Sequence, residues 1–157
     1  MINGIHHVAI STPNMARILQ FYKDVLGFEE ISRVVWQKGT KPIDRVVGLR
    51  DSAAESVMLR AGNAVIEFFE YHAPRAAPKD SEPPANAYGY THFCLDVTDI
   101  DKEYERLKAA GVRFHAPPQD FGTIKATYGR DPDGNIFEIQ ELLGAEHPLR
   151  IVRRAAS

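Results

Sequence analysis

The chain has 157 residues, of which 44% are hydrophobic and 25% charged, a composition typical of a globular domain rather than a disordered, collagen-like or disulfide-rich protein. A domain of this length buries roughly 68–70% of the surface of its unfolded chain, so we expect one domain over residues 1–157. Its 19 basic and 21 acidic residues give a formal charge of -2, which argues against a nucleic-acid partner.

Disulfide bonds and membrane segments are not expected. Cys94 is the only cysteine, and no apolar run approaches the ~20 residues that span a bilayer. The N-terminus lacks the basic and apolar regions of a signal peptide. We therefore expect a cytoplasmic protein without a membrane anchor, and we expect Cys94 to behave as a small buried hydrophobic residue.

The first half of the chain predicts one strand, one helix and three more strands. Thr12 and Pro13 suit the N-cap and first position of a helix that Gly27 ends. Apolar, β-branched and aromatic runs predict the strands. The expected elements are strands at 5–11, 28–36, 56–60 and 64–71, and a helix at 12–27.

The second half repeats this order after a proline-rich linker at 73–88, which cannot pair as a central strand. Thr98 and Asp101 fit a capping box at the start of a helix that Gly111 ends. The expected elements are strands at 90–97, 112–115, 123–128 and 135–142, and a helix at 98–110. The domain thus consists of a βαβββ module at 4–72, the linker, a second βαβββ module at 89–143, and a tail at 144–157.

The repeat places the same ionisable residues at equivalent positions. An offset of 85 aligns His7 with His92, and an offset of 71 aligns Glu67 with Glu138. Because side chains alternate along a strand, all four lie opposite the face that a helix would cover. His6 falls on the other face.

A carboxylate within an apolar strand is costly to bury unless a cation or a proton neutralises it. Singly, each histidine is more often a hydrogen-bonded strand residue, and each glutamate an exposed one. The pairing favours convergence of His7, Glu67, His92 and Glu138 on one divalent transition metal, either Zn, Ni, Co, Fe or Mn.

The sequence resembles the vicinal oxygen chelate superfamily in three runs, IHHVAISTPNMARILQFYKDVLGFE, GYTHFCLDVTDIDKEYERLKAAGV and GRDPDGNIFEIQEL. This superfamily includes glyoxalase I, methylmalonyl-CoA epimerase, extradiol dioxygenases, and fosfomycin- and bleomycin-resistance proteins. The resemblance covers residues 4–143. It implies an α+β fold in which two βαβββ modules form a curved sheet around a metal-binding cleft, with His7, Glu67, His92 and Glu138 at the ligand positions.

The ligand set resembles that of glyoxalase I, in which the metal stabilises an enediolate while a ligand carboxylate moves the proton. Methylmalonyl-CoA epimerase resembles it but usually has Gln at the position of Glu67. Bacterial glyoxalase I has a glutathione-binding Arg and Asn where this chain has Ser11 and Tyr71, which argues against glutathione. We therefore predict a metal-dependent lyase or isomerase that abstracts a proton next to a carbonyl or thioester, with Glu138 or Glu67 as the base.

Two alternatives stay open. Residues 128–138 keep the Tyr, the Asp-Pro-x-Gly turn and the Glu of the extradiol dioxygenase signature, but its upstream His is absent. A non-catalytic drug-binding or ligand-binding protein of the bleomycin-resistance type would use the same cleft without turnover. Metal content separates this binding protein from the enzymes.

The expected partner is a small-molecule substrate, and we expect a homodimer. The sequence leaves open whether the two modules pair within one chain or across the dimer, since superfamily members do either. The loops at 38–51 and 72–87 are expected to shape the pocket. The candidates for holding an anionic substrate are Arg45, Arg60, Lys125 and Tyr128.

Overall fold

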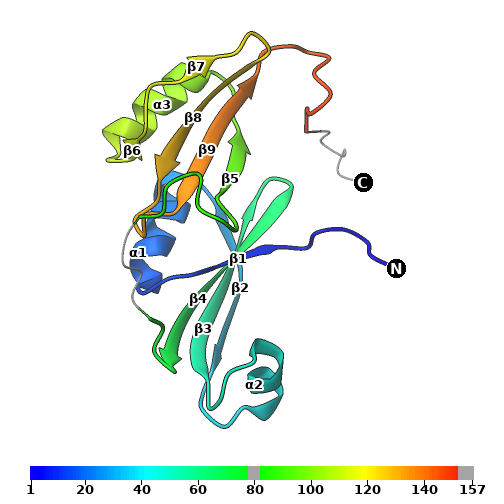
Figure 1. The fold of residues 1–157 in the computed structure, drawn as a ribbon, viewed down its shortest axis with the longest axis vertical. Helices are drawn as coiled ribbons and strands as arrows, with labels where there is room; N and C mark the ends of the chain where they lie inside the picture. The colour runs from blue at the N-terminus through cyan, green and yellow to red at the C-terminus, as the bar shows by residue number, and fades with distance from the viewer. Residues whose placement is uncertain (78–81, 152–157) are drawn as a thin grey trace. The chain divides into compact units, whose positions relative to one another are not determined.

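The computed structural model describes residues 1–77 and 82–151 (Figure 1). The chain forms two compact units, Met1–Asp80 and Ser81–Ser157, and the boundary between them in the sequence falls within the predicted linker. Each unit has its own sheet and at least one helix, so the fold is α+β, as expected from the sequence. No helix in the described part of the chain is long and apolar enough to cross a membrane.

The first unit contains a four-stranded sheet in the order β1-β4-β3-β2. β1 runs parallel to β4, and the other neighbours are antiparallel. The elements are β1 (Val8–Ser11), α1 (Met15–Gln20), the π-helical turn η1 (Phe21–Val25), β2 (Glu29–Trp36), α2 (Lys41–Val47), β3 (Ala53–Ala61) and β4 (Ala64–Ala73). The predicted βαβββ order is present, with α2 added.

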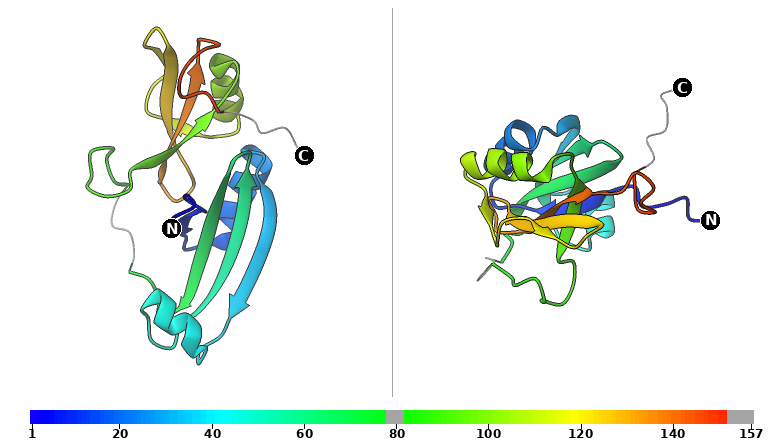
Figure 2. Two further views of the ribbon diagram at one scale, coloured as in Figure 1. Left: turned by 90° about the vertical axis from the view of Figure 1, so that its right-hand side faces the viewer. Right: turned by 90° about the horizontal axis from the view of Figure 1, so that it is seen from above.

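The second unit repeats this topology. Its sheet has the order β5-β9-β8-β6, with β7 pairing to β8 and the β5 to β9 pair parallel. The elements are β5 (His92–Asp96), α3 (Ile100–Ala109), β6 (Arg113–Phe114), β7 (Gln119–Asp120), β8 (Ile124–Arg130) and β9 (Ile136–Leu142). In each unit one helix packs against one face of the sheet, α1 against β4 and α3 against β9 (Figure 2).

The two helices predicted from the sequence, α1 and α3, begin later than expected. The backbone N–H of Thr12 donates to the carbonyl of Phe69, so the chain is still paired with the sheet there, and Asn14 caps α1 instead. The N–H of Val97 likewise donates to the sheet, and Asp99, rather than Thr98, caps α3. Sheet pairing therefore overrides the local capping signals.

The predicted loop at 38–51 contains the unexpected helix α2, which ends at Gly48 in a left-handed conformation. A polar contact fixes this helix to the start of β3. The Asp44 carboxylate accepts bonds from the hydroxyl and the N–H of Ser52, at 2.6 and 2.8 Å, and these bonds lower the pKa of Asp44. Such a contact between a helix and the residue beyond its loop leaves no periodic signal in the sequence.

A strand glutamate caps the helix in each unit. The Glu70 carboxylate accepts the N–H of Met15 at 2.6 Å, and the two oxygens of Glu141 accept the N–H groups of Asp99 and Ile100 at 2.9 and 3.0 Å. These anions satisfy free N–H groups and complement the helix dipole. Glu70 and Glu141 are separated by the same 71 positions as Glu67 and Glu138, so the repeat extends to the helix caps.

We expect Glu141→Ala to lower the free energy of unfolding by about 1–3 kcal/mol, because the N–H of the fully buried Ile100 loses its charged acceptor. Urea denaturation measures this difference. Glu146→Ala, which removes an exposed carboxylate from the same unit, is the matched control and should change stability by no more than about 0.5 kcal/mol. Equal effects of the two substitutions would show that the cap does not stabilise the fold.

Candidate metal and catalytic site

His7 and Glu67 meet on the first sheet. His7 directly precedes β1, and parallel pairing with β4 places Ala9 opposite Glu67. Residues two apart on a strand share a face, so His7 points to the same side as the carboxylate. Its Nε2 lies 3.1 Å from Oε2 of Glu67, which is only 8% exposed.

His92 and Glu138 meet in the same way on the second sheet. Parallel pairing of β5 with β9 places Cys94, two residues after His92, opposite Glu138. Nε2 of His92 lies 3.2 Å from Oε2 of Glu138. Both histidine–glutamate pairs therefore arise from one register, in which the carboxylate lies opposite the second residue after the histidine.

The residue before each histidine contacts Nδ1 of its ring, the nitrogen that does not face the glutamate. Nδ1 of His6 lies 2.8 Å from Nδ1 of His7, and the Thr91 hydroxyl lies 2.9 Å from Nδ1 of His92. A hydrogen bond at Nδ1 orients the ring and leaves Nε2 for the carboxylate or a metal. His6, like His7, precedes β1 and is exposed, and the two rings pack edge-on with centroids 5.1 Å apart.

Glu67 has a second partner that the sequence analysis missed. The hydroxyl of Ser56 on β3 donates to Oε1 of Glu67 at 2.5 Å, and both residues are buried. Antiparallel pairing puts Ser56 opposite Phe69 and Met58 opposite Glu67, so both strands present these side chains on one face. A small polar residue within the otherwise apolar run 56–59 was the available signal.

Tyr128 and Cys94 surround Glu138. Tyr128 lies opposite Glu138 on β8, and its ring centroid is 4.7 Å from that of His92. Burial and the Glu138 charge raise the pKa of the Tyr128 phenol, so it remains a hydrogen-bond donor at neutral pH. Partial desolvation of the thiol and the Glu138 charge also raise the pKa of Cys94. The prediction of a buried Cys94 was wrong, since the residue lies on the sheet face away from α3 and is exposed.

An aromatic cluster extends the face of β4 that bears Glu67. Phe69 and Tyr71 are two and four residues beyond it and stack with ring centroids 5.7 Å apart. Trp36 packs edge-on against both at 6.1 Å. Burial and the Glu67 charge raise the pKa of Tyr71. One side of the His7–Glu67 pair is therefore an apolar surface.

The predicted substrate-binding residues do not all lie with these pairs. Arg60 is on β3 two positions beyond Met58, so it shares the face of Glu67. Lys125 is three positions before Tyr128 on β8 and thus points to the opposite face, where it pairs with Asp101 of α3. That ion pair raises the pKa of Lys125. The structure does not bring Lys125 to Glu138.

Arg45 also lies apart from the His7–Glu67 pair within the first unit. It follows Asp44, whose carboxylate is bound to Ser52 at the start of β3. Met58, the residue opposite Glu67, is five positions beyond Ala53, or about 17 Å along the strand. An arginine side chain anchored beside Ser52 does not span this distance.

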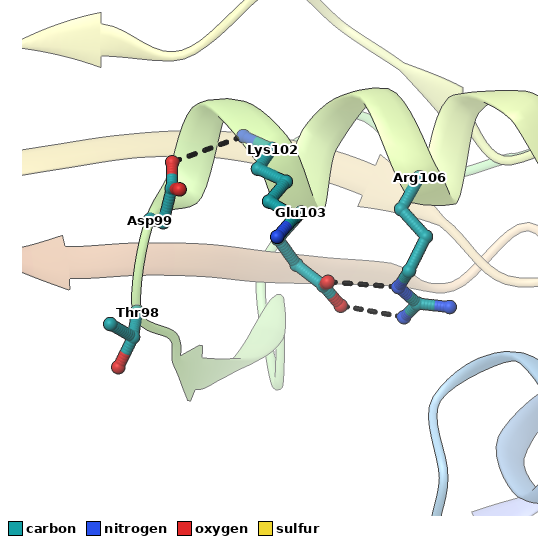
Figure 3. A pocket seen from close by; sticks show the side chains of 5 residues that line it. All are labelled: Thr98, Asp99, Lys102, Glu103 and Arg106. Carbon is teal, nitrogen blue, oxygen red and sulfur yellow. Dashed lines mark hydrogen bonds and ion pairs between the residues drawn. The ribbon is translucent and has the colours of Figure 1, made fainter.

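A hollow beside the start of α3 contains none of the predicted site residues (Figure 3). Two of its charged side chains pair with each other, with Nη2 of Arg106 2.6 Å from Oε1 of Glu103, which lowers the pKa of Glu103. Its lining residues are Thr98, Asp99, Lys102, Glu103 and Arg106. Because these residues belong to α3 and its N-terminus, the hollow is distinct from the face that carries His92 and Glu138.

Each histidine–glutamate pair has the chemistry and spacing of two ligands of one metal ion. Atoms bound to one ion at about 2.0–2.2 Å lie about 3.0–3.5 Å apart, which brackets the 3.1 and 3.2 Å observed. Among residues 1–77 and 82–151, no group of three or more His, Cys, Asp or Glu side chains is arranged to hold a metal. Each unit thus offers two donors that fit a transition metal.

Comparisons with known proteins identify related chains. A 2-epi-5-epi-valiolone epimerase from Actinomyces sp. is 31% identical over 122 residues, covering 74% of this chain and 64% of the relative, so this chain spans less than two thirds of that protein. The uncharacterized protein YaeR from Escherichia coli (strain K12) is 32% identical over 141 residues, 89% of this chain and 97% of its own. A mitochondrial methylmalonyl-CoA epimerase from Dictyostelium discoideum is 27% identical over 144 residues, 89% and 79% of the two chains.

Solved structures share the fold. A glyoxalase family protein from Bacillus cereus has a TM-score of 0.82 at 23% identity, covering 92% of this chain and 97% of its own. A variant of the fosfomycin resistance protein FosX from Listeria monocytogenes, with a TM-score of 0.58 at 18% identity over 88% and 90% of the chains, was crystallised with Mn(II) and 1S,2S-dihydroxypropylphosphonic acid. Residues 4–139 match one family description over most of the chain, and the protein therefore belongs to the Glyoxalase/Bleomycin resistance protein/Dioxygenase superfamily.

Proposed function

We propose that this protein is a metal-dependent lyase or isomerase that abstracts a proton next to a carbonyl or thioester of a small oxygenated substrate. The observation that carries the proposal is the recurrence of one histidine–glutamate pair at one register in both units. Two relatives are named as epimerases, which supports a reaction that begins by proton removal.

In this proposal His7, Glu67, His92 and Glu138 together hold one divalent transition metal. When bound, the ion would act as a Lewis acid on substrate oxygens and stabilise the negative charge that develops as the proton leaves. Two imidazoles and two carboxylates suit Zn, Ni, Co, Fe or Mn and leave coordination positions for the substrate. The Mn(II) of the FosX crystal supports an ion of this class.

The protein's own side chains would move the proton and hold the substrate. Glu138 or Glu67 accepts the proton from carbon and returns it to carbon in an isomerisation. The protonated Tyr128 phenol donates a hydrogen bond to a substrate oxygen. Arg60 supplies a positive charge on the face of Glu67, and Phe69 and Tyr71 pack against the apolar part of the substrate.

Metal analysis followed by a solvent-deuterium exchange screen tests the proposal. The screen uses α-hydroxyketones, hemithioacetals and acyl-CoA thioesters as candidate substrates. We expect bound transition metal in the purified protein and deuterium incorporation next to the carbonyl of one class. Protein that binds no metal, and whose melting temperature does not rise with Ni, Co or Zn, would instead support a non-catalytic binding protein. Fe(II)-dependent oxygen uptake with catechols would support a dioxygenase.

A further inference from the structure

The two glutamates of the candidate site are held differently. Glu67 has a partner at each carboxylate oxygen, with Ser56 donating to Oε1 at 2.5 Å and Nε2 of His7 3.1 Å from Oε2. Ser56 is 6% exposed, and β3 pairs there with β2 on one side and with β4 on the other, so the Ser56 backbone is held in place. The Glu67 carboxylate therefore has little freedom to turn away from His7.

The equivalent position in the second unit has no hydroxyl. Tyr128 lies opposite Glu138 as Met58 lies opposite Glu67, so Ala126 occupies the position of Ser56. The Ala126 methyl group cannot donate a hydrogen bond. Instead, Nε2 of His92 lies 3.2 Å from Oε2 of Glu138, and Cys94, whose thiol is only a weak donor, lies opposite Glu138 on β5.

We propose that Ser56 is a positioning residue that fixes Glu67 as a permanent metal ligand, and that alanine at position 126 leaves Glu138 able to leave the ion when substrate enters. The inference rests on the proposed function and deepens it, because it gives the two glutamates different tasks. A buried hydroxyl that donates to a ligand carboxylate holds its orientation and tunes its binding to the ion.

Two reciprocal substitutions test this difference. Ser56→Ala removes the hydroxyl from Glu67, and Ala126→Ser introduces one beside Glu138. Competition with a coloured chelator gives the dissociation constant for Co(II), and the visible spectrum reports the environment of the bound ion. The melting temperature of the metal-free protein reports stability. Deuterium exchange gives kcat and KM. Ser32→Ala, which removes an exposed serine from β2, is the matched control.

We expect Ser56→Ala to weaken Co(II) binding about 10–100-fold and to alter the Co(II) spectrum, because a ligand loses its outer partner. Ala126→Ser should keep Co(II) affinity and KM but lower kcat about tenfold or more, because Glu138 is now held. A merely structural role for Ser56 predicts a lower melting temperature with unchanged Co(II) affinity.

The outcomes separate the inference from the proposed function. A wild-type protein that binds no Co(II) and exchanges no deuterium overturns both. A wild-type protein that binds Co(II), with the same affinity and spectrum in Ser56→Ala, overturns only the inference. If Ser56→Ala does not fold, Ala126→Ser decides, since a wild-type kcat in that variant contradicts the inference.

Discussion

Glu138→Gln is expected to lower the rate of substrate deuterium exchange by about 10²–10⁴-fold, the usual contribution of a positioned general base. The amide keeps the shape of the side chain beside His92 and Tyr128 but cannot accept a proton at neutral pH. The exchange rate is measured by NMR on metal-loaded protein, at saturating substrate, with metal content determined for each sample.

Glu146→Gln provides a matched control for this substitution, because it neutralises an exposed carboxylate in the same unit. We expect it to exchange deuterium at the wild-type rate. Wild-type exchange by metal-loaded Glu138→Gln would remove Glu138 from the role of base and leave Glu67 as the candidate.

Both His7→Ala and His92→Ala are expected to weaken transition-metal binding by more than about 100-fold, because changes to outer partners of a ligand alone cost about 10–100-fold. The proposal has one ion held by both units, so loss of either imidazole should have an effect of this size. Metal dissociation constants from chelator competition measure it, together with the metal-induced rise in melting temperature.

Histidines outside the two pairs serve as controls, one in each unit. His72→Ala and His147→Ala should bind metal as tightly as the wild-type protein. If His7→Ala lost the metal and His92→Ala kept it, the first unit alone would hold the ion, and the proposed four-residue ligand set would be wrong.

The sequence allowed the α+β fold and the repeated βαβββ order to be predicted because strand and helix periodicities and turn residues are local. The placement of His92 and Glu138 on one face also followed from strand alternation alone. The same rule could have excluded Lys125, because three positions separate it from Tyr128 and put it on the face that packs against α3. That Glu67 and Glu138 belong to one metal site stays a prediction.

Contacts between elements that are distant in sequence could not be predicted. The hydrogen bond between Asp44 and Ser52 stabilises α2, which lies where the sequence predicted a loop. Pairing of Thr12 with Phe69 moves the start of α1. Ser56 was missed because a single serine has no periodicity, and its role depends on the register between β3 and β4.

The last strand of each unit carries two glutamates, one beside a histidine and one at the start of a helix. Glu67 and Glu70 on β4, and Glu138 and Glu141 on β9, are three residues apart, so each pair points to opposite sides of its sheet. Inserting one residue between Glu138 and Glu141 would turn both side chains to the same side, and either the histidine or the helix would lose its anion. Because of this odd spacing, a single strand register serves the histidine contact on one face of the sheet and the helix cap on the other.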